Sequence, residues 1–232
     1  MKFDIKKNNN VEITDRVSEV MSDFDIKLEH SNEVFNGEID IDNKDWNIGL
    51  IVGGSGSGKS TIAKELFGEH YIYSYKYDDR SVLDNMPSDR SVKEIERAFT
   101  SVGFSSPPSW LKPYKVLSTG EKMRVDLAMS VLLDKEMVVF DEFTSVVDRD
   151  VAKTCSKAIQ KTVRRNNKKF VAVSCHSDII EYLCPDWIYD TDQKSFFGLR
   201  GNMSPQDIKL TYTKLVDSIS NKYGEYLGSI II

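Results

Sequence analysis

The feature that most constrains the fold is the run GGSGSGKST at residues 53–61, which follows the apolar run NIGLIV and opens a helical pattern. It matches G-x-x-x-x-G-K-[ST] from Gly53 to Ser60, with the strand before it and the helix after it that this motif requires. Glycines let backbone N–H groups turn toward a phosphate, and the helix start adds partial positive charge. We expect Lys59 to reach the β- and γ-phosphates of ATP and Ser60 to hold Mg²⁺. The predicted loop is Gly53, Gly54, Ser55, Gly56, Ser57, Gly58, Lys59, Ser60 and Thr61.

A second run, MVVFDE at 137–142, ends an apolar stretch in two acids. Ligands of open α/β sheets bind where such strands end. We expect Asp141 to orient Mg²⁺ and Glu142 to polarise an attacking water. The alternative is an acidic strand end that simply faces solvent, which the phosphate loop upstream disfavours.

The pattern of the remaining chain predicts an α/β domain with a mostly parallel sheet, because short apolar runs alternate with helical ones. The runs KFVAVSCH and DWIYD favour buried strands, and residues 91–102, 121–133 and 149–164 favour helices. Residues 1–47 alternate apolar and polar side chains in places, which predicts an antiparallel edge or side sheet.

Composition excludes some classes of protein. The 232 residues carry a net charge of −5, so no global basic surface indicates nucleic acid. The sequence contains no run of 18 or more apolar residues, so no membrane-spanning helix is predicted. The N-terminus lacks a hydrophobic signal segment. Three cysteines at no metal-ligand spacing are expected to be reduced thiols. We expect a cytoplasmic protein that does not insert into a membrane.

The two motifs alone fit a nucleotide kinase, a GTPase or a helicase, and three later runs decide between them. LSTGEKMR lies one helix before the MVVFDE strand, SVVD follows at 145–148, and VAVSCHSD carries His176 after the next strand. Together the five motifs resemble the ABC-type ATPase family over roughly residues 30–190. LSTGE is similar to its signature motif, SVVD to its D-loop and His176 to its switch histidine.

The resemblance implies a P-loop NTPase fold and an ATPase that works as a homodimer. Ser118 and Gly120 would form a second phosphate-binding helix start, which docks on the ATP held by the other copy. Two ATP molecules would then lie between head-to-tail protomers, with Asp148 coupling the sites and His176 holding the γ-phosphate. ATP binding would drive this dimerisation, and hydrolysis would release it.

The chain departs from the family pattern at several positions. Thr119 replaces a glycine and Glu121 a glutamine in the signature, which predicts weaker or slower closure. No glutamine occurs between Ser60 and Ser118, so the family's Q-loop glutamine is missing, and Asp79 is a candidate substitute. Phe35 is a candidate for stacking on adenine, and a core role for it is equally open.

The short segment between Lys59 and Ser118 argues against a transporter motor.

The chain also resembles soluble stand-alone or acetyltransferase-fused ATPases of bacteria and phages, which implies a protein or nucleic-acid partner. A basic edge would serve such a partner, although basic residues at a helix end are usually only solvated; it comprises Lys157, Lys161, Arg164, Arg165, Lys168 and Lys169. The alternatives are an energy subunit of a transporter with a separate membrane partner, and a slow ATP-dependent clamp.

The expected organisation is an ATPase domain over residues 1–200, with a reduced helical and signature subdomain at 70–133, and a C-terminal part over 201–232. The pattern of residues 205–223 predicts a helix, and the terminal Ile230, Ile231 and Ile232 are expected to be covered or paired as an edge strand.

Overall fold

The computed structural model describes residues 1–8, 12–26, 32–42, 44–72, 75–133 and 135–198, with 206–208, 210, 211, 213, 214 and 217. The strands are β1 (Lys2–Asn8), β2 (Asn32–Glu38), β3 (Ile48–Val52), β4 (Tyr71–Ile72), β5 (Met137–Phe140), β6 (Lys169–Ser174), β7 (Trp187–Asp190) and β8 (Ser195–Gly198). The helices are α1 (Asp15–Asp23), α2 (Lys59–Phe67), α3 (Val92–Ser101), α4 (Pro107–Trp110), α5 (Thr119–Leu132), α6 (Arg149–Arg165) and α7 (Ile180–Leu183).

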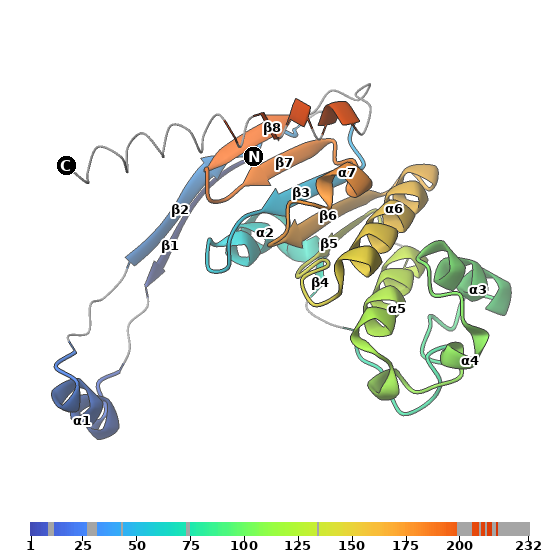
Figure 1. Ribbon diagram of the computed structural model, residues 1–232, viewed down its shortest axis with the longest axis horizontal. Helices are drawn as coiled ribbons and strands as arrows, with labels where there is room; N and C mark the ends of the chain where they lie inside the picture. Colours follow the sequence, from blue (N-terminus) through green and yellow to red (C-terminus); the bar gives the residue numbers. More distant parts are fainter. Residues whose placement is uncertain are drawn as a thin grey trace.

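The main sheet has the order β4-β5-β6-β3-β7-β8, as Figure 1 shows. Its pairs are parallel except for β7 with β8, so the predicted, mostly parallel α/β sheet is confirmed. In the register, Val52 of β3 lies opposite Ser174 of β6 and Asp190 of β7. The phosphate-loop motif, the acidic pair and the residues after β6 and β7 therefore all follow strand ends at one edge of the sheet.

Two apolar layers cover the sheet. One layer joins α2 to the sheet through Ile62 and Phe67, which share a cluster with Ile51, Trp187 and side chains of the N-terminal strands. The other contains the buried faces of α3, α5, α6 and α7. This arrangement fixes α2 directly after β3, with its start at the edge where the strands end.

The N-terminal strands β1 and β2 pair antiparallel as a separate two-stranded sheet, which confirms the expected side sheet. Between these strands Asp15–Asp23 forms the helix α1, which was not predicted. Thr14 caps this helix, with its side chain accepting from the backbone N–H of Val17. Apolar residues at i, i+3 and i+4 spacing then favour a helix over an alternating strand.

The predicted helices at 91–102, 121–133 and 149–164 are confirmed as α3, α5 and α6. Each begins at a side-chain cap: Ser91, Ser118 and Asp148. The antiparallel edge strand β8 was not predicted. Of the predicted C-terminal helix, residues 206–208, 210, 211, 213, 214 and 217 are helical, and the rest lies outside the described residues, as do Ile230, Ile231 and Ile232.

Candidate nucleotide-binding site

The predicted phosphate loop runs from the end of β3 to the start of α2. Gly56 and Gly58 adopt φ values of 80° and 89°, in the left-handed region that glycine enters without a steric penalty. Lys59 is only 8% exposed, and its Nζ donates to the carbonyl oxygen of Gly54 at 2.6 Å. The loop thus curls around its own lysine, and the first turn of α2 faces the same space.

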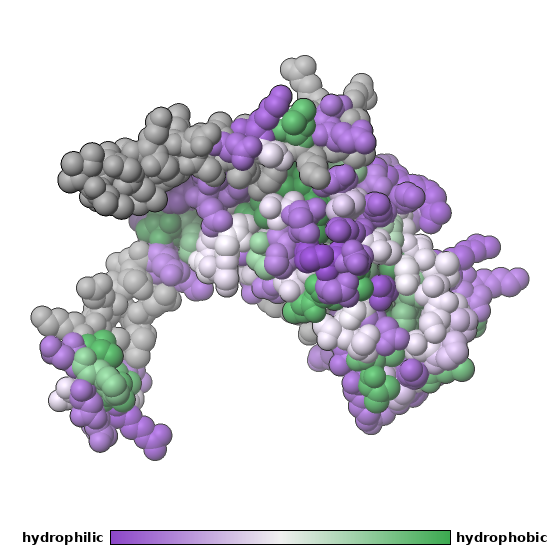
Figure 2. Space-filling model, in the orientation of Figure 1, coloured by the Kyte–Doolittle hydropathy of each residue, from purple (hydrophilic) through white to green (hydrophobic). Residues whose placement is uncertain are grey.

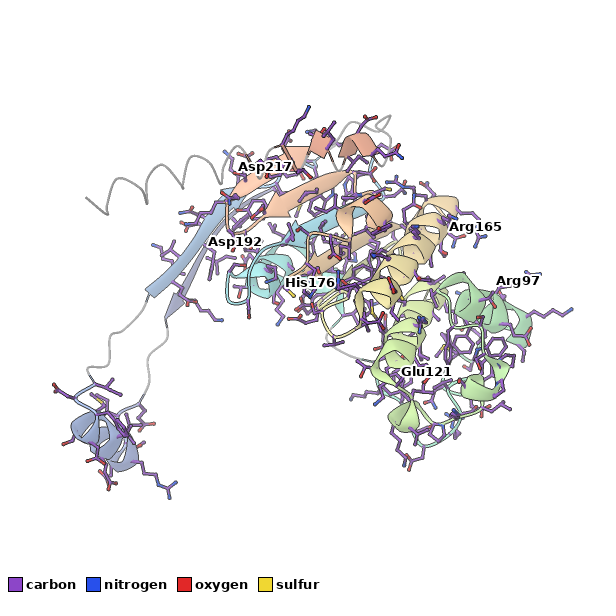
Figure 3. The ribbon with its side chains drawn as sticks, viewed as in Figure 1. Arg97, Glu121, Arg165, His176, Asp192 and Asp217 are labelled. Atoms are coloured by element: carbon purple, nitrogen blue, oxygen red, sulfur yellow. The ribbon has the colours of Figure 1, made fainter. Side chains whose placement is uncertain are left out.

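The turn between β7 and β8 holds this loop in place. The backbone N–H of Gly54 donates to the Asp192 carboxylate at 2.7 Å, and the hydroxyls of Ser57 and Thr191 share a 2.6 Å hydrogen bond. Figure 3 labels Asp192 at this turn. Sequence reasoning missed both residues. They could have been found, because DWIYD is a parallel strand of the same sheet and the residues after it must lie at the edge where the strands end.

A cavity of about 390 Å³ opens in front of the loop. Its lining includes Glu142 from the end of β5 and Cys175 from the end of β6, so the sheet brings the predicted base to the predicted loop. The loop contributes Ser55, Gly56, Gly58, Lys59, Ser60 and Thr61. Glu142 has a φ of 51°, an uncommon conformation for a residue with a side chain.

The N-terminal strands close the outer side of this cavity with Lys7, Glu33 and Phe35. The Phe35 ring lies directly on Gly58, because a Cβ added to Gly58 would overlap it. Gly58 is therefore required for two reasons, its positive φ and this close approach. Phe35 both packs on the loop and lines the cavity. Its two expected roles, packing in the core and stacking on adenine, are therefore compatible.

Asp141 lines a neighbouring cavity together with Glu142 and Thr119, and it is oriented by two hydrogen bonds. Its Oδ1 accepts from the backbone N–H of Glu142 at 2.9 Å, and its Oδ2 accepts from the hydroxyl of Tyr71 on β4. Tyr71 was not predicted; its position in the short polar segment after α2 gave no periodic signal. The proposed substitute Asp79 lies elsewhere: its carboxylate is exposed and pairs with Lys115 at 2.7 Å. The expectation that Asp79 stands in for the missing glutamine is not supported.

The predicted signature residues form a second cluster. The Ser118 side chain accepts from the backbone N–H of Glu121, whose carboxylate accepts from the N–H of Ser118 at 3.0 Å and from the Ser109 hydroxyl at 2.7 Å. The hydrogen bond from the Ser118 N–H, followed by that from Ser109, lowers the pKa of Glu121. Glu121 is thus a structural acid that closes a capping box and favours the helix start.

Asp148 lies close to this cluster, because it caps α6 and a Cβ added to Gly120 would meet Val151 on that helix at 3.6 Å. None of Ser118, Gly120 and Asp148 is among the described residues that line the phosphate-loop cavity. Figure 3 likewise shows Glu121 in the helical part of the molecule and His176 near the sheet edge. His176 follows β6, and its backbone N–H donates to Ser174 at 3.1 Å.

The proposed basic edge is engaged within the chain at four of its six positions. Arg164 pairs with Asp186 at 2.9 Å, and Lys168 donates to the carbonyl of Leu133 at 2.8 Å. Lys157 lies over the Tyr182 ring and Lys169 over the Trp46 ring. These contacts favour the interpretation that the segment stabilises its own helix end and the strands beside it.

Comparison with solved structures gives the fold. The dimeric structure of MJ0796, a bacterial ABC transporter cassette, superposes with a TM-score of 0.58 at 16% identity, over 73% of this chain and 93% of that one. The chain has the ATP-binding cassette fold. A post-hydrolysis dimer of the same cassette bound to ADP and Pi matches equally well, with a TM-score of 0.58 at 15% identity, over 75% of this chain and 95% of that one.

The sequence relatives are transporter proteins by name. A probable ATP-dependent transporter, ycf16 of Trieres chinensis, is 24% identical over 221 residues, covering 74% of this chain and 81% of the relative. An energy-coupling factor transporter ATP-binding protein, EcfA1 of Mycoplasma mycoides, is also 24% identical, over 74% of this chain and 52% of the relative. No family model matches the chain. Among the described residues, none of the cassette's helices is long and apolar enough to cross a membrane.

Proposed function

We propose that this cassette binds Mg-ATP in the phosphate-loop cavity and hydrolyses it to ADP and phosphate. The observation that carries the proposal is that Lys59, Ser60 and Glu142 line one cavity, and that the adjacent Asp141 accepts a hydrogen bond from the backbone N–H of Glu142. A cavity of about 390 Å³ is within the range of roughly 300–1,000 Å³ that small-molecule sites occupy. The hydroxyl of Ser60 and the carboxylate of Asp141 are the hard oxygen donors that Mg²⁺ prefers.

Each residue of the site has a separate role in ATP binding or hydrolysis. Lys59 leaves the Gly54 carbonyl to bind the β- and γ-phosphates, and the N–H groups of the loop and of the α2 start bind the remaining phosphate oxygens. Glu142 accepts a hydrogen bond from the attacking water and polarises it, and His176 orients the γ-phosphate. Bound Mg²⁺ would neutralise part of the phosphate charge. A cytoplasmic location is part of this proposal, because ATP is the substrate.

The second part of the proposal is a head-to-tail dimer. In a single copy neither Ser118 nor Gly120 is among the described residues that line this cavity, although they form a helix N-terminus suited to an anion; Thr119 lines a neighbouring cavity with Asp141 and Glu142. A second copy in the reverse orientation would supply that helix start to the γ-phosphate and Asp148 to the interface. The dimeric cassette structures with the same fold support this arrangement.

Replacing Ser118 by Arg tests the dimer. We expect Ser118→Arg to lose ATP hydrolysis by about a hundredfold or more, because a bulky cation at this helix start blocks closure, while nucleotide binding by the monomer stays unchanged. Fluorescent-nucleotide titration and steady-state hydrolysis measure the two effects. Ser106→Arg is the matched control, since Ser106 is exposed and its side chain caps nothing. Equal loss of nucleotide binding in Ser118→Arg would contradict the separate location of the two clusters.

Tyr71 is proposed to position Asp141 as a metal ligand. We expect Tyr71→Phe to raise the Mg²⁺ concentration for half-maximal hydrolysis about tenfold or more, because groups that orient metal ligands typically contribute that much to affinity. The Phe ring keeps the buried packing, so the free energy of unfolding should fall by about 1 kcal/mol. Hydrolysis against Mg²⁺ concentration and urea unfolding measure both. An unchanged Mg²⁺ dependence would remove this role.

For the biological role, the comparisons favour the energy subunit of a membrane transporter over a switch for a nucleic-acid or protein partner. The relatives reported above are transporter proteins by name, and the basic edge is largely engaged within the chain. We therefore propose a separate membrane partner. Added duplex DNA should not change the rate of ATP hydrolysis. A stimulation of hydrolysis that weakens as the salt concentration rises would instead favour a nucleic-acid partner and the soluble branch of ATPases.

The proposed organisation of the cassette remains an ATPase domain over residues 1–200, a reduced helical and signature subdomain over 70–133 within it, and a C-terminal part over 201–232. In the subdomain, burial raises the pKa of the Asp126 carboxyl, which accepts hydrogen bonds from the hydroxyls of Tyr77 and Tyr114 at 2.7 and 2.8 Å. This buried cluster joins residues 75–78 to α5 and supports the subdomain as one unit.

A further inference from the structure

The helix α1 carries an apolar face with nothing packed on it in the part of the chain that the structure describes. None of its nine residues is buried. Val20 is 51% exposed, and Phe24, which caps the helix end, is 71% exposed. Ile13 and Ile26 on either side are 57% and 49% exposed. An isolated helix of this length is marginal in water, so its sequence pattern indicates that another surface stabilises it.

A second exposed apolar surface lies directly before the signature helix. Leu111 is 68% exposed and Val116 is 61% exposed, on the segment that leads into Ser118. Within one copy the two surfaces are far apart: Figure 1 shows α1 at one end of the molecule and the α3, α4 and α5 group at the other. Figure 2 shows green, apolar surface both on the α1 body and on the lower part of the helical group.

The charges of the two surfaces are complementary. Residues 12–26 contain the acids Glu12, Asp15, Glu19, Asp23 and Asp25 against the single base Arg16. Residues 111–122 contain the bases Lys112, Lys115 and Lys122. Lys115 already pairs with Asp79, and the carboxylate of Glu121 is engaged in the capping box. Complementary charge around an apolar centre favours one partner and one orientation.

The proposed dimer brings these surfaces to the same place. The strands that flank α1 reach the phosphate loop, since Lys7, Glu33 and Phe35 line its cavity. The segment 111–116 adjoins Ser118, which in the head-to-tail arrangement meets the γ-phosphate in the partner's cavity. Each surface therefore adjoins, along the chain, a segment that the proposed dimer brings into contact with the other copy.

We propose that the apolar face of α1 docks on residues 111–116 of a second copy of this chain when the nucleotide-bound dimer closes. This inference rests on the proposed dimer. It makes the N-terminal helix a clamp that adds apolar contact and charge complementarity to an interface otherwise made largely of nucleotide and polar groups. By the symmetry of the dimer, the contact forms twice.

Dimerisation of the Glu142→Gln protein in saturating Mg-ATP, measured by sedimentation, tests the clamp. We expect Val20→Asp with Phe24→Asp to weaken dimerisation on the order of tenfold or more, because two apolar side chains lose their contact at each of two sites. Leu111→Asp with Val116→Asp should weaken it similarly. Val92→Asp is the matched control, since Val92 is 55% exposed at the start of α3 and should leave dimerisation unchanged.

A charge exchange gives a second, independent readout. Glu19→Lys with Asp23→Lys should weaken the dimer, as should Lys112→Glu with Lys115→Glu, and all four changes in one chain should restore it. No core residue is altered, so monomer nucleotide binding by each variant reports intact folding. If the Glu142→Gln protein dimerises and the α1 variants dimerise equally well, the clamp is wrong and the proposed function stands. If Glu142→Gln stays monomeric in Mg-ATP, the proposed dimer fails and the clamp fails with it.

Discussion

Lys59→Ala is expected to lose ATP binding on the order of a hundredfold or more, since charge-assisted hydrogen bonds to the phosphates contribute up to about 3 kcal/mol and each 1.4 kcal/mol is a factor of ten in affinity. Lys59 is buried, and its Nζ donates to the carbonyl oxygen of Gly54, inside the loop that would receive the phosphates. Equilibrium binding of a fluorescent ATP analogue to the purified protein measures the loss.

The matched control for this variant is Lys64→Ala. Lys64 lies on the same helix about one turn farther on, is exposed, and has its Nζ 4.9 Å from the centre of the Tyr71 ring. It should bind ATP normally, because it does not line the phosphate-loop cavity among the described residues. Normal ATP affinity in Lys59→Ala would mean that the loop does not bind the phosphates.

Glu142→Gln is expected to keep ATP binding while hydrolysis falls by about a hundredfold to ten-thousandfold, the range that a positioned general base contributes. The amide keeps the shape of the side chain in the cavity and removes the charge that polarises water. Steady-state phosphate release and nucleotide titration separate the two effects.

Glu136→Gln is the control for this change, because Glu136 is an exposed acid immediately before the same strand, β5. It should hydrolyse ATP at the wild-type rate. Hydrolysis by Glu142→Gln near the wild-type rate would mean that another residue is the general base, and His176 would be the first candidate to test.

The parts of the site that sequence reasoning found are those encoded in short contiguous motifs. The loop from Gly53 to Ser60 and the acids Asp141 and Glu142 each follow an apolar run, and parallel strand ends must meet at one edge of a sheet. Ser118 was found because LSTGE, another short contiguous run, resembles the signature motif of the ABC-type ATPase family. These predictions needed no knowledge of long-range packing.

The missed parts depend on contacts between distant segments. Tyr71 meets Asp141, and Asp192 meets Gly54, across 70 and 138 residues of sequence, which no periodic pattern reveals. The helix α1 was not predicted within the strand-like residues 1–47, because short amphipathic runs fit both periods. Asp79 was a candidate substitute for the missing glutamine, and its exposed carboxylate pairs with Lys115.

The most direct test of the account is the mass of the Glu142→Gln protein in solution, measured by multi-angle light scattering with and without saturating Mg-ATP. A site completed by a second copy predicts a monomer without nucleotide and twice the monomer mass with it, returning to monomer when Ser118→Arg is added. A strictly monomeric Glu142→Gln protein at saturating Mg-ATP would contradict the site shared between two copies. Only the assignment of the phosphate loop as the nucleotide-binding element would then stand.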